Sequence, residues 1–332
     1  MMTARARAAA AWLALLLTIA ATSLVHAAQE SVAPIPLSER TLPTVTANRP
    51  VVVRGAALDL EGPVLDRDGT LFFSDVQGGR VLRMEPSGHI TPIATLHGLM
   101  PGGLAIARDG RIFVAAGNGK GGGAIVAMRP DGSDIEAVVP EAAGFFPNDL
   151  VFNAAGGFYF TDSRGYPGDP AGGAFYVQPG GGPPVPVLSH LAVANGVALS
   201  PDGRRLWIGE YAAGRLYCLD LSDPTTMRPF GAGVAYHFTG LAPDSMRVDA
   251  DGHVYVALYG QGRILVFSPS GIPIGQILLP GRDAGRNLHL TSMAIQPGSR
   301  TMAIVTSDGR PGGKATIFRA RAWGDGLPAP TP

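Results

Sequence analysis

Short apolar runs separated by turn residues fill most of the chain. In residues 61–84 two such runs flank Asp68-Gly69, and a third run follows Gly79-Arg80. An Asp-Gly pair between two alternating runs is typical of a β-hairpin. The pattern therefore predicts a unit of short antiparallel strands joined by tight turns.

This unit recurs along the chain, with further copies beginning near Pro101, Pro147, Ala194, Pro243 and Leu290, the last of them degenerate. When the copies are aligned, the turn position is held by Gly69, Gly110, Gly156, Gly203, Gly252 and Ser299. Spacings of 41 to 49 residues leave room for four strands per copy, which is the period of a propeller blade. We predict an all-β fold, a six-bladed β-propeller with four-stranded antiparallel blades.

The predicted propeller spans residues 51–325. An N-terminal extension at 28–50 precedes it, and a flexible tail rich in proline and glycine follows at 326–332. An incomplete ring would leave open sheet edges. Residues 51–60, which read as a strand left over before the first copy, are therefore expected to pair into the blade of the last copy.

Residues 1–27 have the features of a cleavable signal peptide. Arg5 and Arg7 precede an uncharged apolar run at 8–21, and Val25-His26-Ala27 fits a cleavage site. The alternative is a membrane anchor, but the run is short for a span of about 20 residues. We expect an exported protein, periplasmic or secreted, with no stable membrane insertion after cleavage.

Composition indicates which classes of molecule the protein binds. The 26 basic and 26 acidic residues cancel, and no basic stripe suggests a nucleic acid. The single cysteine, Cys218, excludes an intramolecular disulfide, so stability must come from the core. No feature indicates a protein partner, and a small-molecule substrate is expected.

One position of the repeat carries unusual chemistry. Eight residues before each turn residue stand Glu61, Gly102, Asn148, Asn195, Asp244 and Thr291. The first strand of a blade lines the central channel, so these positions should form a ring at one mouth. Asn and Asp beside Pro or Gly are also common turn residues, which is the plainer interpretation of each one alone.

A cation would explain the ring as a set. Two carboxylates brought together repel each other unless an opposite charge compensates. The side-chain donors are all oxygens, which suits one divalent cation, with Ca²⁺ the first choice and Mg²⁺, Mn²⁺ or Zn²⁺ as alternatives.

With these residues identified, the chain resembles the senescence marker protein/gluconolactonase/luciferin-regenerating enzyme family. The motifs that carry the resemblance are EGPV at 61–64, PNDL at 147–150, NGVA at 195–198 and PD at 243–244, and it covers roughly residues 50–325. The resemblance implies an axial divalent metal bound by Glu61, Asn148, Asn195 and Asp244. It also implies metal-assisted hydrolysis of lactones, with Asp244 as general base or nucleophile.

One departure from the family affects the expected substrate. Sugar-lactone members often carry an arginine two residues before the motif asparagine, where this chain has Phe146. We therefore expect a more apolar mouth and doubt aldonolactone specificity. Gly102 leaves room for substrate, Thr291 belongs to the same ring, and His289 either contacts substrate or packs.

Two other functions remain open from the sequence. The first is a non-catalytic, metal-stabilised propeller that binds a ligand or partner, because propellers serve many functions. The second is a phosphotriester or aryl-ester hydrolase that uses the same site.

Overall fold

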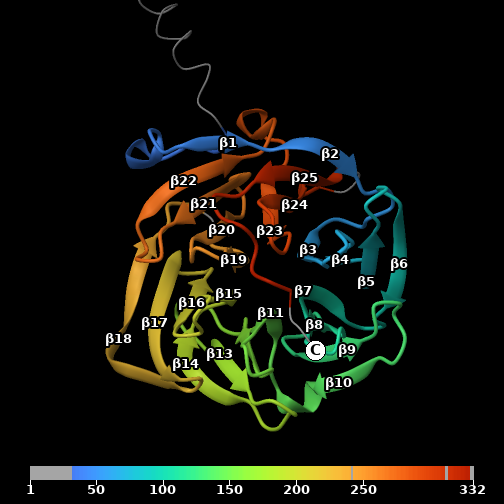
Figure 1. The fold of residues 1–332 in the computed structure, drawn as a ribbon, viewed down its shortest axis with the longest axis vertical. Coiled ribbons are helices and arrows are strands. Elements are labelled where there is room, and N and C mark those ends of the chain that lie inside the picture. Colours follow the sequence, from blue (N-terminus) through green and yellow to red (C-terminus); the bar gives the residue numbers. More distant parts are fainter. Residues whose placement is uncertain (1–31, 241, 311–312, 330–332) are drawn as a thin grey trace, which may run out of the picture.

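A computed structural model describes residues 32–240, 242–310 and 313–329. Six sheets surround a central axis, each with its first strand innermost (Figure 1). The prediction of a six-bladed propeller with four-stranded antiparallel blades is confirmed. The predicted signal peptide lies outside the described residues, and within the described ranges no helix combines the length and apolarity needed to cross a membrane.

Blades 1 to 3 follow the chain in order. Blade 1 consists of β3 (Leu60–Leu65), β4 (Leu71–Asp75), β5 (Arg80–Met84) and β6 (Ile90–Thr95). Blade 2 consists of β7 (Met100–Ile106), β8 (Ile112–Gly117), β9 (Gly123–Met128) and β10 (Glu136–Val139). Blade 3 consists of β11 (Pro147–Phe152), β12 (Phe158–Asp162), β13 (Gly172–Val177) and β14 (Val185–Leu191).

Blades 4 to 6 complete the ring. Blade 4 consists of β15 (Ala194–Leu199), β16 (Arg205–Glu210), β17 (Arg215–Asp223) and β18 (Thr226–His237). Blade 5 contains β19 (Met246–Val248), β20 (Val254–Leu258), β21 (Arg263–Phe267) and β22 (Pro273–Leu278). Blade 6 contains β23 (His289–Ile295), β24 (Thr301–Ser307) and β25 (Ala315–Arg321). The described residues also form the short 3₁₀ helices η2 (Leu37–Glu39), η3 (Glu141–Ala143) and η4 (Arg282–Ala284).

An N-terminal strap, residues 44–52, closes the ring. Its strand β2 (Asn48–Val52) pairs antiparallel with β25 and completes blade 6. Its strand β1 (Thr44–Thr46) adds a fifth, parallel strand to blade 5, which the sequence did not predict. Closure through the N-terminus agrees with the prediction, but the pairing strand ends at Val52. The chain must then turn from the outer edge of blade 6 to the axis before β3 begins, so residues 53–59 do not form a strand.

The repeat and the core agree with the sequence pattern. The aligned turn glycines Gly69, Gly110, Gly156, Gly203 and Gly252 have φ between 70° and 92°, as tight hairpin turns require. In the degenerate sixth copy this conformation belongs to Gly298 instead of Ser299. Six apolar clusters form the core, one between each pair of neighbouring blades. Both faces of a sheet are thus covered, which explains why a strand such as β8 is buried throughout.

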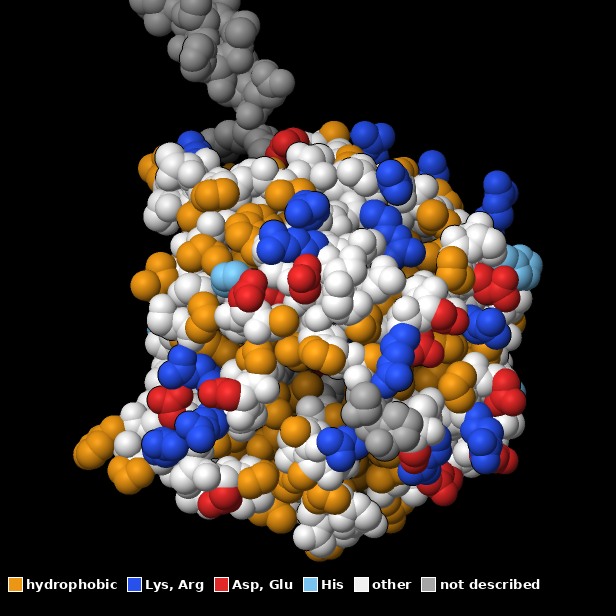
Figure 2. Space-filling view, viewed as in Figure 1, with side chains coloured by type: hydrophobic (Ala, Val, Ile, Leu, Met, Phe, Trp, Pro, Cys, Tyr) orange, Lys and Arg blue, Asp and Glu red, His pale blue; other side chains and the backbone are white. Residues whose placement is uncertain are grey.

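The C-terminal tail lies across the face shown in Figures 1 and 2. Gly326 bridges to Asp249 and Pro297, and residues 327–329 line an apolar cavity of about 250 Å³ at the ends of the inner strands. Figure 2 shows hydrophobic side chains around a hollow near the middle of this face. Residues 330–332 of the predicted flexible tail lie outside the described residues.

A buried ion pair fastens the N-terminal segment to blade 5. Glu39 Oε2 lies 2.6 Å from Arg263 Nη1, and both side chains are almost fully buried. The Tyr236 hydroxyl donates a hydrogen bond to Glu39 Oε1, and Arg263 Nη1 also donates to Gln276 Oε1 at 3.2 Å. Removing one partner of such a pair leaves the other charge buried and uncompensated.

We expect Glu39→Gln to lower the free energy of unfolding by about 3 kcal/mol, because Arg263 would keep its charge without an anion. Urea unfolding followed by circular dichroism measures the change. Asp134→Asn is the matched control, since Asp134 pairs with Arg129 on the exposed surface, and it should leave the midpoint unchanged. Equal stability of Glu39→Gln and the wild type would contradict a stabilising role for the ion pair of Glu39 and Arg263.

Candidate functional site

A cavity of about 320 Å³ opens at the mouth where the inner strands begin, opposite the C-terminal tail. All six positions of the predicted ring line it, namely Glu61, Gly102, Asn148, Asn195, Asp244 and Thr291. Phe146 lines it as well. The fixed repeat offset therefore brings these residues together, although they belong to six different blades.

Irregular pairing shapes the ring. The register of the inner strand shifts between Glu61 and Val64 in blade 1, and at the equivalent place in blades 2, 3, 4 and 6. Such bulges redirect side chains and are frequent beside active sites. The inner strands also approach very closely, since a Cβ on Gly62 would lie 2.3 Å from the carbonyl oxygen of Gly102.

Hydrogen bonds between blades fix the ring positions. The Thr291 hydroxyl donates to the carbonyl of Leu60 at 2.6 Å, so this predicted substrate contact already links blade 6 to blade 1. Packing also requires glycine at position 102, because a Cβ on Gly102 would lie 2.8 Å from the Asn148 carbonyl oxygen. Both residues line the cavity, and both help to set its dimensions.

Burial perturbs both ring carboxylates. Burial raises the pKa of Glu61 from 4.5 to about 8, and the Gly62 amide opposes this rise by donating a hydrogen bond. Burial also raises the pKa of Asp244 well above its usual value, and the Glu61 carboxylate raises it further. The cavity therefore disfavours two bare carboxylates at neutral pH.

The donor set fits a hard divalent cation. Among the described residues no donor reaches the buried Oδ1 of Asn195, which leaves an amide oxygen without a hydrogen bond. Glu61 Oε2 accepts from the Gly62 amide at 2.8 Å and the Ser245 hydroxyl at 3.4 Å. A cation would satisfy the Asn195 oxygen and offset both negative charges, and oxygen-only sites suit Ca²⁺ or Mg²⁺.

An ion pair between a partly buried arginine and a buried aspartate lies beneath the ring. Arg247 Nη1 donates to Asp149 Oδ2 at 3.0 Å, and Asp149 directly follows Asn148 of the ring. Because Arg247 lines the far cavity, the pair lies along the channel between the two cavities. Burial raises the pKa of Asp149, and Arg247 opposes the rise. The sequence analysis did not assign this pair, since neither residue occupies the repeat position of the ring.

One wall of the cavity is apolar. Met100, Phe146 and Val193 line it, each two residues before a ring position in blades 2, 3 and 4. The Phe146 ring lies against the backbone of Gly117, where a Cβ would come within 1.9 Å of it. This agrees with the expectation of an apolar mouth at Phe146.

Two tyrosines form a further part of the cavity wall. Tyr211 and Tyr259 line the cavity, and each is the first residue after the second strand of its blade. The repeat did not predict either residue, because Tyr211 stands eight residues after its turn glycine and Tyr259 seven. His289 is not among the described residues that line the cavity. Its Nδ1 lies 2.6 Å from the Tyr259 hydroxyl oxygen, so it stands behind that side chain.

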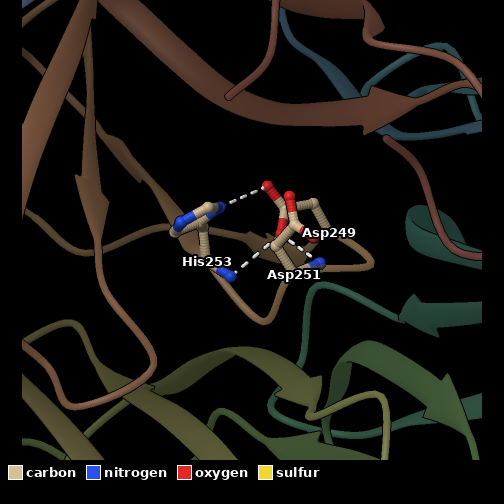
Figure 3. A group of neighbouring side chains, drawn as sticks. All are labelled: Asp249, Asp251 and His253. Atoms are coloured by element: carbon tan, nitrogen blue, oxygen red, sulfur yellow. Dashed lines mark hydrogen bonds and ion pairs between the residues drawn. The ribbon is translucent and has the colours of Figure 1, made fainter. Parts of the chain in front are cut away.

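A second group of possible ligands lies at the opposite end of β19. Asp249, Asp251 and His253 come together in the hairpin turn between β19 and β20 (Figure 3). The Asp249 carboxylate already accepts four hydrogen bonds, from the amides of Asp251 and His253, the His253 ring and the Tyr255 hydroxyl. These bonds occupy its lone pairs and stabilise the turn, so this group is a weaker cation site than the axial ring.

Comparison with known proteins identifies the family. The SMP-30/Gluconolactonase/LRE-like region matches residues 60–307. The chain belongs to this family. The family resemblance found in the sequence is therefore confirmed.

Relatives within and beyond this family are numerous. The lactonase drp35 of Staphylococcus saprophyticus is 42% identical over 303 residues, covering 90% of this chain and 94% of that protein. The lactonase drp35 of Staphylococcus haemolyticus is 41% identical over 286 residues, covering 85% and 88%. Among solved structures, a calcium-binding regucalcin from Agrobacterium tumefaciens has a TM-score of 0.67 at 18% identity, covering 86% of this chain and 98% of that one. At this identity the last comparison shows the fold alone.

The raised pKa of Glu61 predicts how the metal-free SMP-30/gluconolactonase/LRE-like chain responds to pH. Between pH 4.5 and about 8 the folded protein holds a proton that the unfolded chain has released. The free energy of unfolding should therefore fall as pH rises through this window. Thermal melts in chelator at pH 5, 6, 7 and 8 measure the slope.

Glu61→Gln removes one titrating group and should make this slope shallower, while the buried Asp244 and Asp149 still contribute to it. Glu141→Gln, an exposed substitution outside the cavity, should keep the slope of the wild type. Identical slopes for Glu61→Gln and the wild type would show that Glu61 does not titrate in this range.

Proposed function

We propose that this protein is a lactonase that uses one divalent cation, with Ca²⁺ as the first choice, held by Glu61, Asn148, Asn195 and Asp244. The observation that carries this proposal is the buried Asn195 Oδ1, to which no donor in the described part of the chain bonds. It lies in the same cavity as two carboxylates whose pKa values are raised. The chain is an ester hydrolase by homology, as the sequence predicts, because relatives at 41–42% identity are lactonases. The calcium-binding regucalcin of the same fold supports the choice of metal.

The residues of the cavity would have different roles in hydrolysis. A bound cation supplies Lewis-acid polarisation of the lactone carbonyl and lowers the pKa of water. Asp244 would act as general base and take a proton from the attacking water, because its carboxylate lines the cavity in which the substrate would bind. Glu61 balances the cation's charge. The apolar wall orients the part of the substrate that does not react.

Metal removal tests this proposal directly. Chelation should abolish lactone hydrolysis, and added Ca²⁺ should restore it, with the circular dichroism spectrum unchanged throughout. Asp244→Asn should lower kcat by at least about 100-fold, the usual contribution of a general base. Full activity after thorough metal removal would refute the mechanism.

Calorimetric titration with Ca²⁺ separates the two candidate cation sites. Asn195→Ala should weaken binding, because it removes a buried oxygen that accepts no hydrogen bond from the residues the structure describes. Asp251→Asn is the matched control in the turn at the opposite end of β19 and should leave the affinity unchanged. Weaker binding by Asp251→Asn together with unchanged binding by Asn195→Ala would place the cation in that turn instead of on the axis.

The cavity wall supports a substrate class as well as a reaction. Met100, Phe146 and Val193 form a surface that offers no hydrogen bonds to sugar hydroxyls. We therefore propose lactones with an apolar ring substituent, and poor turnover of polyhydroxylated lactones.

Phe146→Ala should raise KM for an alkyl- or aryl-substituted lactone by about 10-fold or more, the usual effect of lost apolar contact in a pocket. A small unsubstituted lactone should show little change. Tyr166→Ala, an exposed aromatic residue outside the cavity, serves as control. An equal rise in KM for the substituted and the unsubstituted lactone would contradict a role for Phe146 in recognising the substituent.

The reaction type is tested separately. A substrate panel that includes a phosphotriester shows whether the wild type prefers ester or phosphate chemistry.

A further inference from the structure

A cluster outside the ring faces the same cavity. Tyr259 and Asp59 both line the cavity together with Asp244. Behind them, His289 Nδ1 lies 2.6 Å from the Tyr259 hydroxyl oxygen and 3.5 Å from Asp59 Oδ1. The three side chains come from blades 5, 1 and 6, and none of them belongs to the proposed metal ligands.

The cluster is held firmly in place. Asp59 Oδ1 accepts from the Ser307 hydroxyl at 2.7 Å, and Asp59 Oδ2 accepts from Gln77 Nε2 at 3.1 Å. The imidazole of His289 lies directly against Gly309, where a Cβ would come within 2.1 Å of the ring. Preorganised groups of this kind can act in a reaction without first being reoriented.

The charges around Tyr259 determine what its hydroxyl can do. Burial raises the pKa of the Tyr259 phenol, and Asp59, Tyr211, Asp244 and Glu61 raise it further, in that order. An isolated tyrosinate is therefore strongly disfavoured here. A group that returns a proton to Tyr259 in the same step would avoid this tyrosinate.

His289 is placed to do this. In its imidazolium form, Nδ1–H donates to the Tyr259 oxygen, and the Tyr259 hydroxyl hydrogen is then free to donate into the cavity. The Asp59 carboxylate at 3.5 Å stabilises that cation. In the neutral form with hydrogen on Nε2, Tyr259 would instead donate to Nδ1, and no proton would be available to the cavity.

We propose that Tyr259 is the general acid that protonates the ring oxygen leaving the lactone, and that His289, positioned by Asp59, replaces its proton. This inference rests on the lactonase function proposed above. A lactone opens by expelling an alkoxide, which is a poor leaving group without a proton donor. Asp244 takes a proton from water, so a separate acid completes the reaction.

The step balances without any further reagent. The oxygen of water bonds to the carbonyl carbon, and Asp244 takes one proton from that water. The bond between the carbonyl carbon and the ring oxygen breaks, its electron pair stays on the ring oxygen, and that oxygen takes the Tyr259 proton. Tyr259 takes the Nδ1 proton of His289. Solvent then removes the proton from Asp244 and returns one to His289, leaving a hydroxy acid with no change of oxidation state.

The test compares two lactones that differ in the leaving group. An aliphatic lactone expels an alkoxide, and an aryl lactone expels a phenolate, which needs far less help because the pKa of a phenol is about 10. Tyr259→Phe should lower kcat at least about 100-fold for the aliphatic lactone and less than about 5-fold for the aryl lactone. His289→Gln should show the same selectivity with a smaller loss. KM and Ca²⁺ affinity should change little.

Tyr211→Phe is the matched control, since Tyr211 lines the same cavity and its ring packs edge-on against Tyr259 at 6.1 Å. It should leave the ratio of the two rates unchanged. If Tyr259→Phe does not fold, His289→Gln carries the same comparison.

Equal losses on both lactones, or no loss on either, would overturn the inference while the lactonase function stands. If the wild type opens neither lactone in the presence of Ca²⁺, the proposed function fails, and this inference fails with it.

Discussion

The closeness of two carboxylates at the propeller axis is the constraint on which the site depends. Glu61 and Asp244 belong to blades 1 and 5, and the packing of the inner strands brings them into one cavity. There the loss of water and the neighbouring negative charge both raise their pKa values. Such an arrangement favours either bound protons or a bound cation, and the unsatisfied Asn195 oxygen favours the cation.

The rest of the fold maintains that closeness. The N-terminal strap supplies the outer strand of blade 6, so the ring is closed by strands from both ends of the chain. The buried pair of Glu39 and Arg263 fastens the segment that leads into this strap. Inside the ring, bonds such as that from Thr291 to Leu60 connect one inner strand to the next. Opening the ring would therefore separate the charged groups that the site needs to keep together.

Blade position also divides the cavity by chemistry. Blades 2, 3 and 4 contribute Met100, Phe146 and Val193 two residues before the ring. Blades 1 and 6 contribute Asp59 and His289 at the same offset, and blade 5 places Tyr259 between His289 and the cavity. One repeat position thus forms an apolar surface on one side and a polar cluster on the other. This division separates the part of the site suited to hold substrate from the part suited to move protons.

The sequence alone determined the number of blades, the ring positions and the apolar residue at Phe146. A repeat with a constant offset places equivalent residues at equivalent heights around one axis. Counting eight residues back from each turn was therefore sufficient to find the ring positions. The tertiary structure decided what the repeat does not encode. Tyr259, His289 and Asp59 lie far apart in the chain, and their contacts form only when blades 5, 6 and 1 pack together. The same holds for Asp149 and Arg247, and for Gly102, whose missing side chain serves the close approach of blades 2 and 3. Pair contacts between different blades depend on side-chain direction and ring closure, and no single blade contains that information.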